Sequence, residues 1–498
     1  MEAVEQKKKS LVRLLLDRNI LIEPEFLQQL NSTNDPAIIS ALINEKLGAQ
    51  PEPTVIEQPI QKIEVKSITP AIRRDGVVKV GYSYVPEKRK IVVQDFITYF
   101  TSRYNIIKKI LQQRTQLENI TSIGKLKAKN EREAVSVIGM VYEKEDTKNG
   151  IMVTIEDPTG SIKVYFSKNK QEIAAKAQDI IHDEVIGITG SMGKNIIFAN
   201  DAFFPDIPMT KELKKSPDEE YAVFISDLHV GSKQFLEDQL LKFISWIRGD
   251  TGNDAQKTLA SKVKYVFVTG DLVDGISNHP GQKVDLNIFT FREQYKKVTE
   301  YLKMIPEDIQ LIVCPGNHDI VPIAEPQPAL PQSYCPDLHM MPNVTIVSNP
   351  ALVNIGSKPG FPGFDVLMYH GYSYNFYADK IESIRTQKPN ISERAPLVMK
   401  MLLQKRHLTP THDANPKMPT EVDHMIIDKV PDIFISGDVH KSAVFTYKNV
   451  ITGIISSCFQ STTDFQEWVG HVPDPGRVPL VNLKTREVKI LNFGEAID

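Results

Sequence analysis

In the second half of the chain, short apolar runs repeatedly end in an aspartate, an asparagine or a histidine. The five runs cover residues 221–225, 266–269, 311–314, 366–369 and 433–436. Their length and bounding polar residues predict strands. Segments 237–247 and 291–304 carry apolar residues at helical spacing between the runs, and residues 479–493 predict a terminal hairpin. Strands that alternate with helices predict a layered α/β domain, which we place at residues 219–498.

A different pattern precedes this domain. Residues 131–206 read as short strands separated by turns, with Gly139 inside the first strand, as at a bend, and a turn at residues 156–160. This pattern predicts a β-barrel of the oligonucleotide-binding type. With a helix from residue 93 to about residue 117, the barrel is predicted to occupy residues 93–210.

The N-terminal region separates into two further parts. Leucines at helical spacing predict a small helical domain at residues 1–49. It either packs around its own core or docks a partner, and the pattern leaves both readings open. Residues 50–92 are predicted to be a linker, because prolines interleaved with polar residues at its start cannot build a packed core. The fold class is therefore multidomain: a helical unit, a barrel and an α/β domain.

Composition restricts the class of protein. A chain of 498 residues with 41% hydrophobic and 24% charged residues is an ordinary globular protein of several domains. No apolar run is long enough to span a bilayer, and the N-terminus lacks a signal-peptide pattern, so we expect a cytoplasmic protein without a membrane contact. A net charge of -3 counts against a protein that coats DNA by itself. Three widely spaced cysteines argue against a zinc ribbon and a disulfide framework.

The polar residues that end the runs carry the candidate chemistry. They are Asp227 and His229, then Asp271, then Asn317, His318 and Asp319, then His370, and finally Asp438 and His440. Ligands of open α/β sheets bind outside the carboxyl ends of the strands, so these distant segments should meet in one site. Carboxylates combined with imidazoles suit a divalent metal such as manganese, iron or zinc.

The ordered segments resemble the calcineurin-like metallophosphoesterases, whose signature is D-x-H, G-D, G-N-H-D/E, H and G-H-x-H. The chain carries Asp227-Leu-His229, Gly270-Asp271, Gly316-Asn-His-Asp319, His370-Gly371 and Gly437-Asp-Val-His440. It departs from the family at Asp438, where the family usually has histidine. Aspartate also binds divalent metals, and its charge should favour manganese or magnesium over softer ions.

This resemblance implies a two-metal site. Asp271 would bridge the metals, Asp227, His229 and His440 would complete the first site, and Asn317, His370 and Asp438 the second. His318 would be the catalytic proton donor to the leaving oxygen, and Asp319 would support the ligands from behind. The expected cofactors are two divalent ions, Mn²⁺ before Mg²⁺.

The barrel in front of the phosphoesterase motifs makes the chain similar to the small subunits of archaeal family D DNA polymerases. This resemblance implies a proofreading 3′-to-5′ exonuclease that acts on 3′ ends of single strands or on mismatched primers. Its partner would be a large catalytic subunit, in a heterodimer or a heterotetramer, and contacts with a sliding clamp or a primase are left open. Two alternatives remain: a non-catalytic scaffold subunit, and a phosphatase or cyclic-nucleotide esterase.

Other polar and aromatic residues match no motif position. Asp274, His279, His339, His407, His412 and His424 are predicted to serve only the surface or local structure. Tyr142, Tyr165 and Phe166 could stack on bases, but barrel core or an inter-domain contact is the prediction we favour for them.

Overall fold

The computed structural model describes residues 78–126, 128–278, 281–388, 392–463, 466 and 472–494. The chain divides into two compact units, Met1–Thr69 and Pro70–Asp498, and every described residue belongs to the second. The predicted helical domain at 1–49, most of the linker at 50–92 and His279 lie outside the described residues. Among the helices of the described part, none is long and apolar enough to cross a membrane.

Two mixed six-stranded sheets form the centre of the larger domain. The first has the order β1 (Val78–Ser83), β11 (Ala351–Ile355), β12 (Phe364–Met368), β13 (Ile433–Ser436), β15 (Ile451–Ile455) and β14 (Ala443–Tyr447). The second has the order β10 (Val344–Ile346), β9 (Gln310–Cys314), β8 (Val263–Thr269), β7 (Tyr221–Ile225), β16 (Arg477–Asn482) and β17 (Val488–Asn492). The five strands predicted from the apolar runs are confirmed as β7, β8, β9, β12 and β13.

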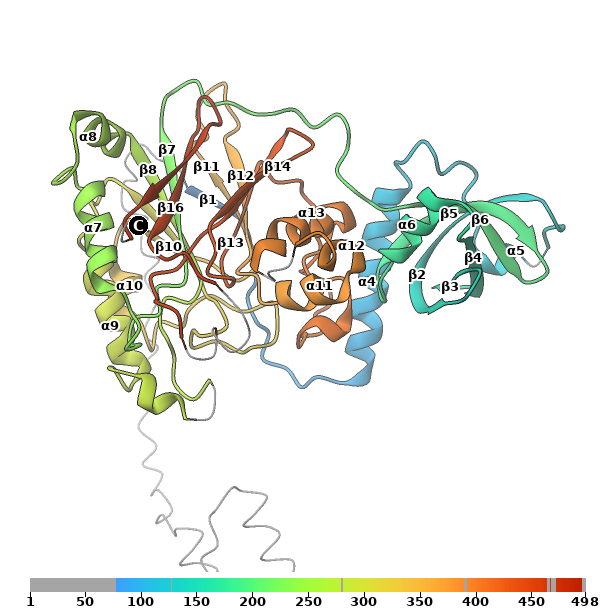
Figure 1. The fold of residues 1–498 in the computed structure, drawn as a ribbon. Helices are drawn as coiled ribbons and strands as arrows, with labels where there is room; N and C mark the ends of the chain where they lie inside the picture. The colour runs from blue at the N-terminus through green and yellow to red at the C-terminus, as the bar shows by residue number, and fades with distance from the viewer. Residues whose placement is uncertain are drawn as a thin grey trace, which may run out of the picture. The chain divides into compact units, whose positions relative to one another are not determined.

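The two sheets pack face to face around a shared apolar core. Phe224 of β7 stacks on Phe267 of β8, and Val366 and Ile435 of the first sheet belong to the same cluster. Helices cover the outer faces (Figure 1). On the second sheet lie α7 (Glu237–Ile247), α8 (Asp254–Ser261), α9 (Phe291–Leu302) and α10 (Pro336–Met340); on the first lie α11 (Tyr374–Lys380), α12 (Glu382–Arg385) and α13 (Ala395–Lys405). The result is a four-layered α/β domain.

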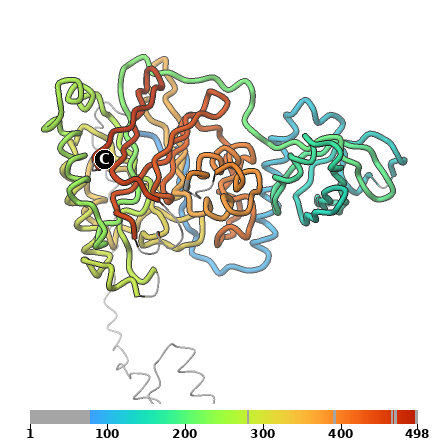
Figure 2. The backbone as a smooth tube through the Cα atoms, in the orientation of Figure 1, coloured from blue at the N-terminus to red at the C-terminus, as the bar shows by residue number. Residues whose placement is uncertain are grey.

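The predicted C-terminal hairpin is confirmed and completes the second sheet. β16 pairs antiparallel with β17 and, on its other side, with β7, where Leu480 lies opposite Val223. In Figure 2 the red end of the chain accordingly returns to the sheet that the green segment begins. Both faces of β7 are buried, which explains its unbroken apolar sequence.

A closed five-stranded barrel precedes the sheets. Its order is β2 (Ala134–Asp146), β3 (Gly150–Asp157), β4 (Gly160–Ser167), β6 (Ile196–Phe203) and β5 (Val185–Gly193), with α6 (Gln171–Gln178) beside it. Phe166 belongs to the barrel core, as predicted. The prediction that Tyr142 lies in the barrel core or in an inter-domain contact is wrong, because its side chain is 66% exposed. The strand β2 is irregular between Val141 and Glu143, and the alternation of inward and outward residues shifts there.

Helix α4 (Val93–Leu111) packs on the barrel and is shorter than predicted. Its Tyr104, Ile107 and Leu111 share an apolar cluster with barrel residues, and Leu117 joins the same cluster from outside the helix. The chain turns after Leu111 so that Leu117 reaches this cluster, and a helical pattern that includes Leu117 therefore overestimates the helix. The short α5 (Ile123–Leu126) follows.

The predicted linker is too long at its C-terminal end. Residues 78–83 form β1, which pairs antiparallel with β11 at the edge of the first sheet. The next residue, Tyr84, donates its backbone N–H to Ser348 Oγ at 2.7 Å, 264 residues further along the chain. The partners of this strand are so distant in sequence that the local pattern around it does not identify it.

Candidate metal centre

The polar residues that end the strands meet at one edge of the two sheets. β7, β8 and β9 are mutually parallel, and Asp227, Asp271 and Asn317 follow their carboxyl ends. In the other sheet β12 and β13 are parallel, and His370 and Asp438 follow them. Parallel strands deliver their carboxyl ends to the same side, so five segments reach one place.

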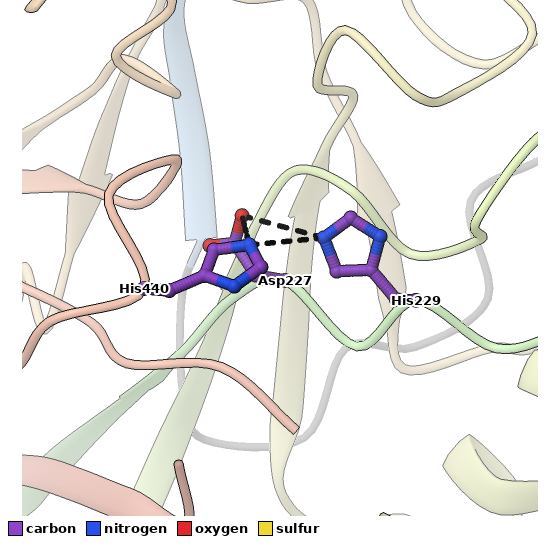
Figure 3. A group of neighbouring side chains, drawn as sticks. All are labelled: Asp227, His229 and His440. Carbon is purple, nitrogen blue, oxygen red and sulfur yellow. Dashed lines mark hydrogen bonds and ion pairs between the residues drawn. The ribbon is translucent and has the colours of Figure 1, made fainter. Parts of the chain in front are cut away.

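Asp227, His229 and His440 form the first group of side chains (Figure 3). His440 Nε2 lies 3.4 Å from Asp227 Oδ1 and 3.1 Å from His229 Nε2. His229 Nε2 is 3.9 Å from the same carboxylate oxygen. All three side chains are buried, and their donor atoms point toward one another as they would around a cation.

Asp271 links the remaining ligands to this group. Its Oδ2 lies 3.8 Å from His229 Nε2 and 3.2 Å from His370 Nε2. His370 Nε2 is in turn 3.7 Å from Asp438 Oδ1. Asp227, Asp271 and His370 form a second potential metal-binding group, and His229, Asp271 and His318 a third. Asp271 Oδ2 thus lies near one histidine from each of the two ligand sets that the resemblance implies.

Two histidines are held with the same ring nitrogen facing the centre. His370 Nδ1 lies 2.8 Å from the backbone oxygen of Thr269, and His229 Nδ1 lies 3.1 Å from Asp274 Oδ1. An N–H at Nδ1 can donate to each of these oxygens, which leaves the Nε2 lone pair free toward the centre. Metal-binding histidines are commonly oriented in this way.

Asn317 also fits a metal ligand. Its side-chain Oδ1 is buried, and no described residue hydrogen-bonds to it. A buried amide oxygen without a partner is unfavourable by roughly 1–3 kcal/mol. A cation would satisfy this atom, and the donor set of carboxylate, amide and imidazole groups suits manganese, iron or zinc.

Electrostatic interactions inside the site are strong because its groups are buried. Burial opposes ionisation of Asp271, yet His370 and His318 hold the pKa of its carboxyl well below the ordinary value. Burial also opposes charge on His370, but the carboxylates of Asp271, Asp227 and Asp438 raise its pKa well above the ordinary value. Burial raises the pKa of Asp438 to about 6. The carboxylates therefore stabilise positive charge at this place.

The backbone adopts an uncommon conformation at five of the assigned ligands. The φ angles are positive at Asp227 (51°), His229 (50°), Asp271 (50°), Asp438 (66°) and His440 (54°). Residues other than glycine adopt such angles at a cost of roughly 1–3 kcal/mol each. Other described residues besides glycine have positive φ angles in turns, but these five lie together in one cluster, where such strain is typical of functional sites.

Two motif glycines allow the segments to approach one another. A Cβ on Gly316 would lie 2.2 Å from Asp271 Oδ1, and a Cβ on Gly437 would lie 1.9 Å from Ser226 Oγ and 2.5 Å from Asp227 Oδ2. Any side chain at these positions would displace the carboxylates.

Asp319 and Asp274 form hydrogen bonds that position the candidate ligands. Asp319 Oδ2 accepts the backbone N–H of Gly316 at 2.8 Å, and its Oδ1 accepts the hydroxyl of Tyr295 at 2.8 Å. Asp319 therefore shapes the turn that presents Asn317. The prediction for Asp274 as a residue of the surface or of merely local structure is wrong, because it is buried and orients His229. Its one sequence signal is its place three residues after Asp271.

His318 lies beside the ligands. Its Nδ1 is 2.9 Å from the backbone oxygen of Asp274, and its ring meets that of His229 edge-on at 4.7 Å. Burial opposes charge on this ring, but Asp271, the contact with the Asp274 oxygen and the Asp274 carboxylate raise its pKa above the ordinary value. A histidine that holds its proton near neutral pH can donate it to a leaving group.

Comparisons with known proteins extend this picture. Residues 222–446 match the model of the family of B subunits of DNA polymerases alpha and epsilon. The DNA polymerase II small subunit of Methanothermobacter thermautotrophicus is 38% identical over 403 residues, which are 80% of this chain and 80% of the relative. The protein of that name from Thermoplasma acidophilum is 34% identical over 97% of this chain and 93% of the relative. For the Pyrococcus furiosus protein the identity is 34%, and the match covers 81% of this chain and 64% of the relative.

Proposed function

Because this chain belongs to the family of DNA polymerase II small subunits, we propose that it pairs with a large catalytic subunit and serves the complex as a metal-dependent 3′-to-5′ exonuclease. The observation that carries the proposal is the convergence of carboxylates and imidazoles from both sheets, together with the buried Oδ1 of the motif residue Asn317, to which no described residue hydrogen-bonds. Unpaired 3′ ends of DNA, as at a mismatched primer, would be the substrate.

Two divalent cations fit the donor atoms. Asp227, His229, Asp271 and His440 would hold one, and Asp271, Asn317, His370 and Asp438 the other. Such cations neutralise charge on a phosphate and lower the pKa of a water molecule. Manganese suits this mixed oxygen and nitrogen set, and magnesium is the alternative.

The other residues of the site would position groups and move a proton. His318 would donate a proton from Nε2 to the leaving sugar oxygen, since its Nδ1 already faces the Asp274 oxygen. Asp274 would keep His229 in the orientation that presents Nε2. Asp319 would hold the turn before Asn317 through the N–H of Gly316.

The test uses the purified full chain and single-stranded DNA labelled at its 3′ or 5′ end, with and without manganese. The expected result is rapid loss of the 3′ label and progressive shortening of the 5′-labelled strand, dependent on manganese and absent in Asp271→Asn. Digestion from the 5′ end would overturn the polarity, and no manganese-dependent digestion would overturn the exonuclease.

A scaffold subunit without catalysis is the second candidate, and Asp438 favours it. Burial and nearby carboxylates raise the pKa of this side chain to about 6, and a carboxylate here adds negative charge where the metallophosphoesterases carry a neutral imidazole. Exonuclease rates of the parent, Asp438→Ala and Asp438→His against manganese concentration distinguish the candidates, because a scaffold subunit shows no manganese-dependent rate in any of them. We expect Asp438→Ala to need more manganese and Asp438→His to remain active. Equal rates for Asp438→Ala and the parent would remove Asp438 from the ligand set.

A further inference from the structure

A cavity of about 530 Å³ adjoins the candidate metal centre. The segment after β8 lines it, including the 3-10 helix η1 (Gln282–Asp285). Its lining includes Ile276, Asn278, Gln282, Lys283, Leu286 and Phe289. This volume lies in the range of roughly 300–1,000 Å³ that is usual for ligand sites.

Hydrogen bonds connect the wall of the cavity to the centre. Asn278 Nδ2 donates to the backbone oxygen of Asp274 at 2.8 Å and lies 3.0 Å from His318 Nδ1. Gln282 Nε2 donates to Asp274 Oδ2 at 2.9 Å. Asp274 also contacts His229, so a molecule in the cavity would lie next to the groups that act on the phosphate.

The lining combines four kinds of side chain: apolar, aromatic, cationic and amide. Leu286 is buried, whereas Phe289 is 53% exposed. Lys283 is exposed on η1, and the Asn278 amide is exposed beside His318. This combination of an accessible aromatic ring, an apolar side chain, a cation and an amide matches a nucleotide. The base of a nucleotide stacks and forms hydrogen bonds, and its phosphate attracts a cation.

We propose that this cavity receives the terminal nucleoside of a single strand, with its base against Phe289 and Lys283 near a backbone phosphate. The proposal rests on the proposed function, because it assigns the substrate of the same centre. A base that enters the cavity must leave its stack and its pairing partner, which takes least energy at a mismatched or single-stranded end. The cavity would thereby select unpaired 3′ ends.

Two small esters isolate the contribution of the nucleoside. Thymidine 5′-(p-nitrophenyl phosphate) carries a nucleoside on the phosphate, and methyl p-nitrophenyl phosphate carries a methyl group in its place. With the full chain and manganese, cleavage of either ester would release p-nitrophenol, and the ratio of their kcat/KM values measures recognition of the nucleoside. We expect Phe289→Ala to lower this ratio about tenfold, the lower part of the range for base stacking on an aromatic side chain.

Val284→Ala is the matched control. Val284 lies in η1, the 3-10 helix before Phe289, and is 69% exposed, but it does not line the cavity. This variant should keep the parent ratio. Lys283→Gln should lower the affinity for a labelled thymidine hexanucleotide and weaken its dependence on salt.

The outcomes separate this assignment from the proposed function. If the parent cleaves both esters and Phe289→Ala keeps the parent ratio, the cavity does not bind the nucleoside and the hydrolase stands. If the parent cleaves neither ester, the exonuclease assay on labelled DNA decides the proposed hydrolysis, and equilibrium binding of thymidine 5′-monophosphate decides the cavity. Weaker binding by Phe289→Ala than by the parent supports the assignment, and equal binding overturns it.

Discussion

At the scale of single residues, the centre depends on how each imidazole is held. His229 and His370 both engage an oxygen through Nδ1 and turn Nε2 toward the carboxylates. The partner of His370 is a backbone oxygen, whereas the partner of His229 is the side chain of Asp274. The orientation of His229 can therefore be changed by a substitution, and that of His370 is a property of the strand end.

Asp271 is the residue whose loss should affect both cation sites. Its Oδ2 faces His229 and His370, which belong to different proposed sites. In Asp271→Asn we expect calorimetric titration to show manganese binding weakened by more than about tenfold at each site, since even residues behind the ligands contribute about 10–100-fold. Loss of one site alone would contradict a bridging position. Asp250→Asn, which changes an exposed aspartate, is the control.

His318 should affect the rate and not the affinity for metal. A proton donor to the leaving group contributes about 10²–10⁴-fold to the rate. In His318→Ala we expect a loss of that size in exonuclease rate at saturating manganese, with manganese binding close to that of the parent. The exposed His182 provides the control His182→Ala. If binding and rate fall together in His318→Ala, the residue is a ligand.

The sequence could predict the candidate metal ligands, but not all of the residues that orient those ligands through hydrogen bonds. The motif residues were identifiable because each ends an apolar run. Asp274 follows the same run, yet its hydrogen bond to His229 depends on how β7 and β8 lie side by side. Asn278 and Gln282 reach Asp274 from a loop whose pattern predicts no element.

At the scale of elements, the strands were predictable, whereas the backbone conformation of the residues that follow them was not. The apolar runs of β7, β8 and β9 are buried in the second sheet, and the runs themselves indicate this burial. After β7 and β8 the positive φ angles at Asp227, His229 and Asp271 occur at aspartate and histidine, residue types that do not signal this conformation in a sequence as glycine does. The short β1 escaped prediction because its hydrogen-bond partners lie in a distant strand.

Gly437 tests how closely the ends of β7 and β13 must approach. A Cβ in Gly437→Ala would collide with Ser226 Oγ and Asp227 Oδ2. We expect unfolding free energy to fall by roughly 1–3 kcal/mol, as in overpacked cores, and manganese binding to weaken because Asp227 is displaced. Gly249→Ala meets no atom within 4 Å but has a φ of 77°. It should lose roughly 1–2 kcal/mol and keep manganese binding. Unchanged binding in Gly437→Ala would show that Asp227 can move without loss.

At the scale of the whole molecule, buried charges join the barrel region to the sheets. Lys405 of α13 contacts Glu184, next to β5, at 2.7 Å. Arg103 of α4 donates from Nε to Asp423 Oδ2 at 2.7 Å, and its guanidinium also reaches the backbone oxygen of Asp183 at 3.2 Å. Removing one member of a buried pair leaves the other uncompensated. The sequence shows two domains here, but it does not show the ionic contacts that connect them.

One histidine in this junction makes stability depend on pH. His407 Nε2 lies 2.9 Å from Asp423 Oδ2. Burial lowers the pKa of His407 to about 4 despite the neighbouring Asp423, whereas an unfolded histidine titrates near about 6.5. Between these values the unfolded chain binds the extra proton. The contribution of His407 to stability is therefore complete above about pH 6.5 and decreases as the pH falls toward about 4.

Urea unfolding of the full chain between pH 7.5 and 4.5 measures this contribution. A difference of about 2.5 pKa units corresponds to at most about 3 kcal/mol, so the pH dependence that the parent has and His407→Gln lacks should amount to a large part of that value. His407→Gln should be less stable at pH 7.5, because a buried hydrogen bond is disturbed, and should show a shallower pH slope. His182→Gln, at an exposed histidine, should retain the parent slope. If the stability of His407→Gln depends on pH as steeply as that of the parent, the acid sensitivity arises from other groups. Protonation of His407 then does not weaken the junction between barrel and sheets.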